Sequence, residues 1–102
     1  MYAELTKAKL DSANQKGVTL TGVNLFAADL HNADLTGANL RNANLYAANL
    51  GEADLSYANL CSAGLRDASL RYAKLAGANL RGADLFQADL KGATMPDGIV
   101  NE

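Results

Sequence analysis

A five-residue repeat runs through almost the whole chain and constrains its fold more than any other feature. Leucine occupies every fifth position from Leu5 to Leu90 except Gln15, and Met95 takes the next position in the series. Alanine or, twice, valine stands two residues before each of these positions. The residue in between is usually Asp or Asn, so the unit reads Ala-Asp/Asn-Leu-X-X, where X varies.

A period of five fits neither an ordinary helix nor a straight strand. On a helix, at about 100° per residue, successive leucines would step about 140° around the axis and leave no apolar face. On a strand, side chains alternate, so residues five apart would point to opposite sides. The Ala-x-Leu segment can be extended with Ala and Leu on one side, provided that the X-X pair turns the chain each time. Such a chain coils around an axis.

The composition indicates that the interior of this coil is narrow. Hydrophobic residues make up 49% of the chain, but aromatic residues only 6%, and Trp is absent. Ala and Leu therefore supply most of the core, in regular layers. Glycine accepts corner dihedrals at low cost, and it recurs at the second X position. These glycines are Gly17, Gly22, Gly37, Gly77, Gly82 and Gly92.

The unit resembles that of the pentapeptide-repeat family, and the likeness covers nearly all of the chain. This resemblance implies an all-β fold, a right-handed quadrilateral β-helix (a β-solenoid) of about five coils with four pentapeptides each. Residues 20 apart would then stack. We expect a single domain over residues 1–102, with repeats at about 3–95 and a C-terminal turn and capping segment at 96–102.

The two ends of the repeat differ. At the C-terminus, Pro-Asp-Gly at residues 96–98 is a turn signal, and Ile99-Val100 could pair as a short strand across the last coil. This ending resembles that of many bacterial, especially cyanobacterial, members of the family, and we interpret it as the true end. Residues 3–16 are less regular and predict either a first coil or a capping helix that Gly17 stops; the leucine spacing favours the coil. An uncovered end could stack on another copy, giving an end-to-end homodimer.

Charge and cysteine content exclude several classes of partner and site. The net charge is -2, with basic and acidic residues interspersed, which gives no indication of direct binding to nucleic acid or to a membrane. One cysteine allows no internal disulfide. No basic and apolar leader and no long apolar stretch occurs, so we expect a cytoplasmic protein.

Candidate chemical sites are few, and we predict no catalytic residue, cofactor site or metal site. His31 occupies an X position one coil from Asp11, which indicates a surface ion pair. Cys61 also occupies an X position and is expected to be an exposed free thiol without a His or Cys partner. The Asp/Asn column is expected to bond to the turn backbone and not to calcium. Neither a phosphate-binding loop nor a dinucleotide motif is present.

One outward column remains as a candidate interaction surface. With four pentapeptides per coil, Phe26, Tyr46, Arg66 and Phe86 fall in one line, and Arg66 could pack between Tyr46 and Phe86. Such a strip has the composition of an interface core. Alternatively, stacking between coils could merely stabilise that face.

The leading hypothesis is therefore a non-enzymatic scaffold that presents a rigid surface to an unknown protein partner. The family resemblance raises an alternative, a DNA-mimicking modulator of DNA gyrase or another topoisomerase. That role needs a strongly acidic flank, which basic residues interrupt here. These residues are Arg41, Arg66, Arg71, Lys74, Arg81 and Lys91. A module of a larger protein is a third possibility; an engineered repeat is a fourth, against which the irregular first coil argues.

Overall fold

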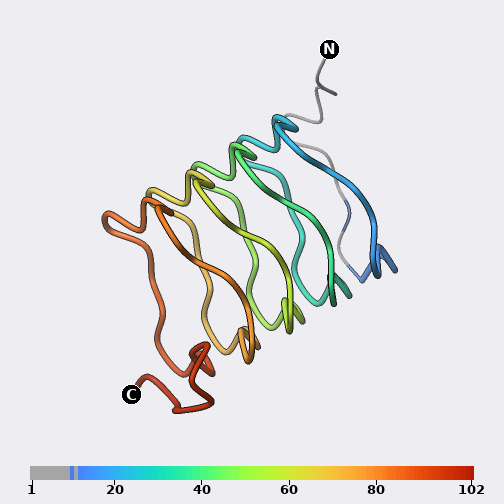
Figure 1. The fold of residues 1–102 in the computed structure, drawn as a ribbon. Coiled ribbons are helices and arrows are strands. Elements are labelled where there is room, and N and C mark those ends of the chain that lie inside the picture. Colours follow the sequence, from blue (N-terminus) through green and yellow to red (C-terminus); the bar gives the residue numbers. More distant parts are fainter. Residues whose placement is uncertain (1–9, 11) are drawn as a thin grey trace.

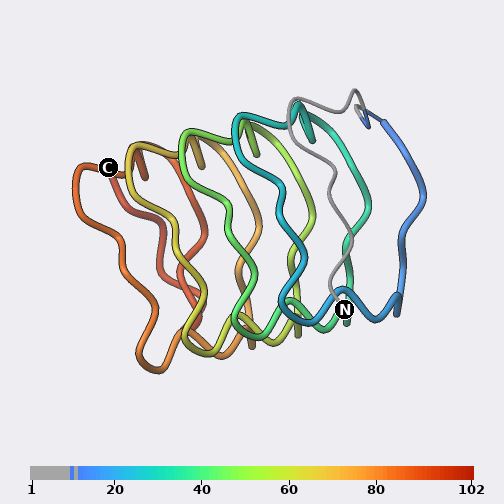
Figure 2. The ribbon, with the colours of Figure 1, turned by 90° about the horizontal axis from the view of Figure 1, so that it is seen from above.

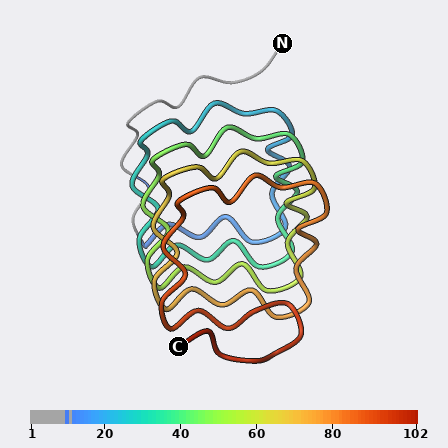
Figure 3. The same ribbon diagram turned by 90° about the vertical axis from the view of Figure 1, so that its left-hand side faces the viewer.

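The chain winds into a rod of stacked coils. The computed structural model describes Leu10 and residues 12–102 of the 102-residue chain. Each coil turns sharply at its corners, and successive coils lie side by side along one axis (Figures 1 and 2). Viewed from the side in Figure 3, the coils repeat the same outline at successive heights. The protein is a right-handed quadrilateral β-helix, as the family resemblance implies.

Neighbouring coils are joined by parallel backbone bridges of one residue each. Asn44 pairs with Gly64, which holds the equivalent position in the next coil, and the next such step joins Gly64 to Asp84. Parallel bridges of this kind run from Asn14–Asp34 to Lys74–Thr94, and the described residues contain neither a helix nor a longer strand. Four pentapeptides therefore complete one coil.

The bridges divide the rod into four faces, which we number in the order in which the chain passes through them, starting at Asn24. The first face carries the bridge residues 24, 44, 64 and 84, and the second carries 29, 49, 69 and 89. The third face carries residues 14, 34, 54, 74 and 94, and the fourth carries 19, 39, 59 and 79. The two X residues of each pentapeptide form the corner that follows its face.

The leucine and alanine columns fill the interior, which confirms the predicted inward assignment. From Leu25 to Leu75 every leucine of the repeat is at most 1% exposed. The alanines between them are equally buried, and the described residues include no buried polar or charged side chain. Leu80, Leu85 and Leu90 belong to the last coil, are only partly buried and pack against this core.

Every corner uses the same turn. The N–H of each repeat alanine donates to the carbonyl oxygen of the leucine before it, as Ala53 does to Leu50 at 3.0 Å. The second X residue then has a positive φ throughout residues 12–92, for example +70° at Gly77. The predicted corner role of glycine is therefore confirmed, but non-glycine residues such as Tyr57 adopt the same dihedral. Since this conformation costs a side chain about 1–2 kcal/mol, hydrogen bonds between coils offset local strain.

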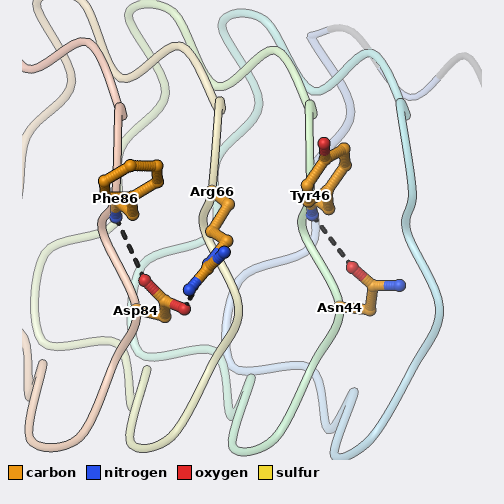
Figure 4. Close-up of polar contacts among 5 residues, drawn as sticks. All are labelled: Asn44, Tyr46, Arg66, Asp84 and Phe86. Carbon is orange, nitrogen blue, oxygen red and sulfur yellow. Dashed lines mark hydrogen bonds and ion pairs between the residues drawn. The ribbon is translucent and has the colours of Figure 1, made fainter.

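The Asp/Asn column serves these turns, as expected from the sequence. The side-chain Oδ1 of Asn44 accepts a hydrogen bond from the backbone N–H of Tyr46 at 3.0 Å, and Asp84 accepts from Phe86 at 3.1 Å (Figure 4). The same bond recurs between other Asp or Asn residues and the first X position around the rod; for example, Oδ1 of Asn59 accepts the backbone N–H of Cys61 at 3.0 Å. The column residues therefore fix the corners that hold the X side chains in line.

Two exposed tyrosines have a structural role that the sequence analysis missed. The ring of Tyr57 lies over Gly77 of the next coil, where an added Cβ would overlap it, and the ring of Tyr72 covers Gly92 in the same way. The signal for this packing is an aromatic residue at a second X position with glycine at the equivalent position of the next coil. The absence of a side chain at Gly77 thus gives Tyr57 a flat surface on which to lie.

The C-terminal segment closes one face of the last coil, as predicted. The N–H of Met95 donates to the carbonyl oxygen of Ile99 at 2.9 Å, and Thr94 forms an antiparallel bridge with Val100. The side-chain Nδ2 of Asn101 also donates to the carbonyl oxygen of Leu90 at 2.9 Å. Residues 96–98 therefore turn the chain back, and Val100 adds one antiparallel bridge beyond the third face.

At the other end, Leu10 and residues 12–16 continue the coil pattern. The N–H of Leu10 donates to the backbone carbonyl oxygen of Asp29, and Asn14 forms a parallel bridge with Asp34. The remainder of the segment with two predicted conformations, residues 3–9 and Asp11, lies outside the described residues. Stacking of a second copy on this end stays a prediction.

Candidate functional site

The four residues of the predicted interaction surface lie in one line on the corner after the first face. We call Phe26, Tyr46, Arg66 and Phe86 the aromatic strip. Each is the first X residue of its pentapeptide, and each belongs to the coil after the previous one. Tyr46 is 40% exposed and Phe86 is 58% exposed, whereas Phe26 is half-buried. The strip therefore presents ring surface to solvent along the rod.

The side chains of the strip pack in two pairs. The rings of Phe26 and Tyr46 are stacked, with centroids 5.4 Å apart and planes 11° apart. The guanidinium carbon of Arg66 lies 5.1 Å from the centre of the Phe86 ring, within the range of a cation–π interaction. The predicted contact of Arg66 with Phe86 is present. Among the contacts of the described residues, none of this kind joins Arg66 to Tyr46.

Arg66 turns away from Tyr46 because Asp84 attracts it. Its Nε lies 2.6 Å from Oδ2 of Asp84, while Oδ1 of the same carboxylate accepts the N–H of Phe86 (Figure 4). Arg71 and Asp89 repeat this arrangement one face further on, at 3.6 Å. In both pairs the aspartate belongs to the Asp/Asn column of the next coil, 18 residues after the arginine. Comparison of residues 20 apart, which lie in the same column, does not reveal such a diagonal pair. Both groups are exposed, so the pair orients Arg66 more than it stabilises the fold.

The ion pair with Arg66 changes the pKa of the Asp84 carboxyl group. The hydrogen bond from Arg66, followed by that from the N–H of Phe86, lowers the pKa of Asp84 below its ordinary 3.8. A lowered pKa in the folded state means that the stabilising contribution is present above the ordinary pKa and is lost as the pH falls through the lowered value. We expect an NMR titration of the Asp84 carboxyl carbon to show a midpoint below 3.8, and the Arg66→Ala variant to move it upward. An unchanged midpoint in that variant would contradict the pairing.

The other candidate residues are not brought together. His31 is exposed and its Nε2 lies 3.0 Å from Nδ2 of Asn32, while its predicted partner Asp11 lies outside the described residues. Cys61 is a free thiol, but it is half-buried and not fully exposed as expected, because Arg41 and Ser62 approach its sulfur at 4.0 Å.

The described part of the chain offers no enclosed site. It contains neither a pocket nor a group of three or more His, Cys, Asp or Glu side chains that could hold a metal ion. Within the same residues, no helix has the length and apolar character needed to cross a membrane. The candidate site formed by the aromatic strip is an exposed surface.

Comparisons with known proteins agree with this architecture. The family model described as pentapeptide repeats matches residues 3–42, 43–70 and 63–97. No curated protein matches the chain significantly. Among solved structures, HetL of the cyanobacterium Nostoc sp., a pentapeptide repeat protein involved in heterocyst differentiation regulation, is 39% identical with a TM-score of 0.76. That match covers 97% of this chain and 52% of HetL, so the chain spans about half the length of that relative.

Two further structures share the fold. A pentapeptide repeat protein from the thylakoid lumen of Arabidopsis thaliana is 25% identical, with a TM-score of 0.90 over 98% of this chain and 70% of its own. QnrB1, a plasmid-mediated fluoroquinolone resistance protein, is 22% identical, with a TM-score of 0.73 over 88% of this chain and 46% of its own. At that identity the likeness to QnrB1 concerns the fold alone.

Proposed function

Because the chain belongs to the pentapeptide-repeat family, we propose that it is a non-enzymatic scaffold that binds another protein through the aromatic strip. The observation that carries this proposal is the alignment of Tyr46 and Phe86, both substantially exposed, on one edge of a rigid rod. Aromatic residues and arginine are enriched in the energetically dominant parts of protein interfaces. The strip offers three of the former and one of the latter.

The stacking within the strip supports this role physically. Tyr46 is held against Phe26, and Arg66 is held by Asp84 over Phe86, so these side chains lose little further conformational freedom on binding. Ordering a flexible side chain at an interface costs about 0.5–1.5 kcal/mol, and pre-organised groups avoid most of that cost. A regulatory role of the kind described for HetL, which is involved in heterocyst differentiation regulation, is one that such a scaffold can serve.

The test is a pull-down from the native extract with the wild-type chain and with the triple variant Phe26→Ser, Tyr46→Ser, Phe86→Ser. We expect the triple variant to lose the specifically bound protein while keeping its folded state by circular dichroism. The matched control is Tyr57→Ser with Tyr72→Ser, which removes two exposed rings from other corners and should retain the partner. If the triple variant recovers the same proteins as the wild type, the strip only stabilises its face.

A DNA-mimicking action on gyrase is less well supported. It requires a continuous acidic surface, but Arg66 and Arg71 pair with Asp84 and Asp89, which neutralises two of the acidic residues of the first and second faces. The likeness to QnrB1 is one of fold, and no described feature of the surface favours this alternative.

A further inference from the structure

The aromatic strip is one of two rims along the first face. The other rim is the corner between the fourth and first faces, where the X positions carry a different set of residues. These are Thr21, Gly22, Arg41, Asn42, Cys61, Ser62, Arg81 and Gly82. None of them is acidic, although the chain as a whole has a net charge of -2. We call this corner the arginine rim.

The charges of the arginine rim are not neutralised by ion pairs within the described residues. The two ion pairs among the described residues lie on other corners and belong to Arg66 and Arg71, each with an aspartate of the next coil. The residue that stands in the same relation to Arg41 is Asn59, which carries no charge. For Arg81 the regular coil supplies no such residue, because residues 96–101 fold back against Ala93 and Met95. Arg41 instead approaches the sulfur of Cys61 with its Nη1 at 4.0 Å, a weak contact. Both guanidinium groups are therefore available to an anionic partner.

Between the two rims, Gly64 is the one bridge residue of the first face that has no side chain. Its neighbours along the bridge column are Asn44 and Asp84, and a Cβ at Gly64 would meet nothing within 4 Å. Gly64 is not among the residues with positive φ, so the turn does not require glycine here. Neither crowding nor backbone conformation explains the missing side chain, which leaves an opening in the middle of the face.

We propose that the first face receives an extended segment of a partner protein in which acidic and apolar residues alternate. Side chains of an extended chain point alternately to opposite sides. A segment that runs along the rod over Gly64 therefore directs its carboxylates to Arg41 and Arg81 and its apolar side chains to Tyr46 and Phe86. This inference rests on the proposed function, because the aromatic strip supplies one of the two rims.

The dimensions fit a short segment. Arg41 and Arg81 are two coils apart, or roughly 10 Å at about 4.8 Å per coil. This lies between the spacings of about 7 Å and about 13 Å that separate same-side residues two and four apart in an extended chain, and the long arginine side chains can span the difference. The strip from Phe26 to Phe86 covers three coils, or about 14 Å, and matches about four to five residues. The charge of the rim selects an acidic segment over a basic one, and its guanidinium groups can bind carboxylates through paired hydrogen bonds.

The experiment uses a fluorescein-labelled octapeptide in which Glu alternates with Leu and Tyr, and a second peptide with Lys in place of each Glu. Fluorescence anisotropy at low and moderate salt measures the binding of both to the full chain. We expect the wild type to bind the Glu peptide and not the Lys peptide. Arg41→Glu with Arg81→Glu should weaken binding of the Glu peptide at least tenfold. The matched control, Lys74→Glu with Lys91→Glu, makes the same change of charge away from the first face and should change the affinity by less than twofold.

Gly64→Asn separates binding from folding. The new amide oxygen would accept the N–H of Arg66, as its counterparts do elsewhere in the column, so the melting temperature should stay the same or rise. Because the side chain fills the opening, affinity for the Glu peptide should fall several-fold. If the affinity and the melting temperature both stay unchanged, the segment does not pass over Gly64 and the inference is overturned.

The outcomes distinguish this inference from the proposed function. A Glu peptide that the wild type does not bind, or that binds equally to the rim variant and to the control variant, overturns the inference. One outcome is that the strip variant Phe26→Ser, Tyr46→Ser, Phe86→Ser loses the native partner while the rim variant, Arg41→Glu with Arg81→Glu, keeps it. That result supports the scaffold function and overturns the inference that the partner segment is acidic. If the rim variant loses both the Glu peptide and the native partner, the inference stands.

Discussion

Replacing Leu50 with lysine should unfold the protein or lower its melting temperature by tens of degrees. Leu50 is fully buried in the middle of the rod, between leucines of the coils on either side. The substitution removes apolar packing, which costs about 2–5 kcal/mol, and places an ammonium group among apolar side chains without a partner. The sum approaches the whole free energy of unfolding of a small domain, about 5–15 kcal/mol. Thermal melts followed by circular dichroism measure the effect.

The control is Arg41→Ala, which changes an exposed corner residue of a neighbouring coil and should alter stability by less than about 0.5 kcal/mol. Equal melting temperatures for the two variants would show that the leucine column does not face the interior. Because each coil depends mainly on its neighbours, we also expect the lysine variant to disturb both halves of the rod.

Replacing Ala53 with phenylalanine should have the second largest effect, for the opposite reason. Ala53 is fully buried and its column neighbours, Ala33 and Ala73, are equally enclosed one coil before and one coil after. The coil spacing of about 4.8 Å leaves no room for a ring between these layers. Overpacking of a close-packed interior typically costs about 1–3 kcal/mol for small additions, and we expect about 3 kcal/mol or more here. Urea titration gives the change in the free energy of unfolding.

Ala76→Phe is the matched control, since it makes the same substitution at a first X position. Phe26 and Phe86 already occupy positions of this kind, and Ala76 is only half-buried. This variant should lose less than about 1 kcal/mol. A comparable loss in both variants would mean that the interior can expand to accept a ring, contrary to the predicted narrow core.

The five-residue period was sufficient to predict which residues face inward. It placed Leu50 and Ala53 in the core and Asn44 at the turn, because only one side of each extended segment can face the axis. It did not determine that four pentapeptides complete a coil, since any corner angle is compatible with the period; the family resemblance supplied that number. The packing of Tyr57 on Gly77 was missed because only the stacking of successive coils brings the two positions together.

The candidate site was predictable as a column, and so was the contact of Arg66 with Phe86, but the ion pair of Arg66 with Asp84 was not. The alignment of Tyr46 with Phe86 follows from the pairing of equivalent residues in successive coils. The side chain of Arg66 binds Asp84 and does not pack on Tyr46, since a charged hydrogen bond of 2.6 Å is stronger than contact with a neutral ring. Such choices among exposed side chains depend on acceptors within reach, here an aspartate diagonally across the next coil, and not on the period.

The pairing of each bridge residue with its equivalent in the next coil also governs how this protein can change in length. An insertion or deletion of one whole coil returns every later residue to its original face, so the surface pattern survives and the rod only grows or shrinks. Loss of a single pentapeptide keeps all leucines in the core, yet it rotates everything after it by a quarter turn and would move Phe86 out of line with Tyr46. Gene duplications in steps of four pentapeptides can therefore lengthen such a chain while its binding face stays continuous.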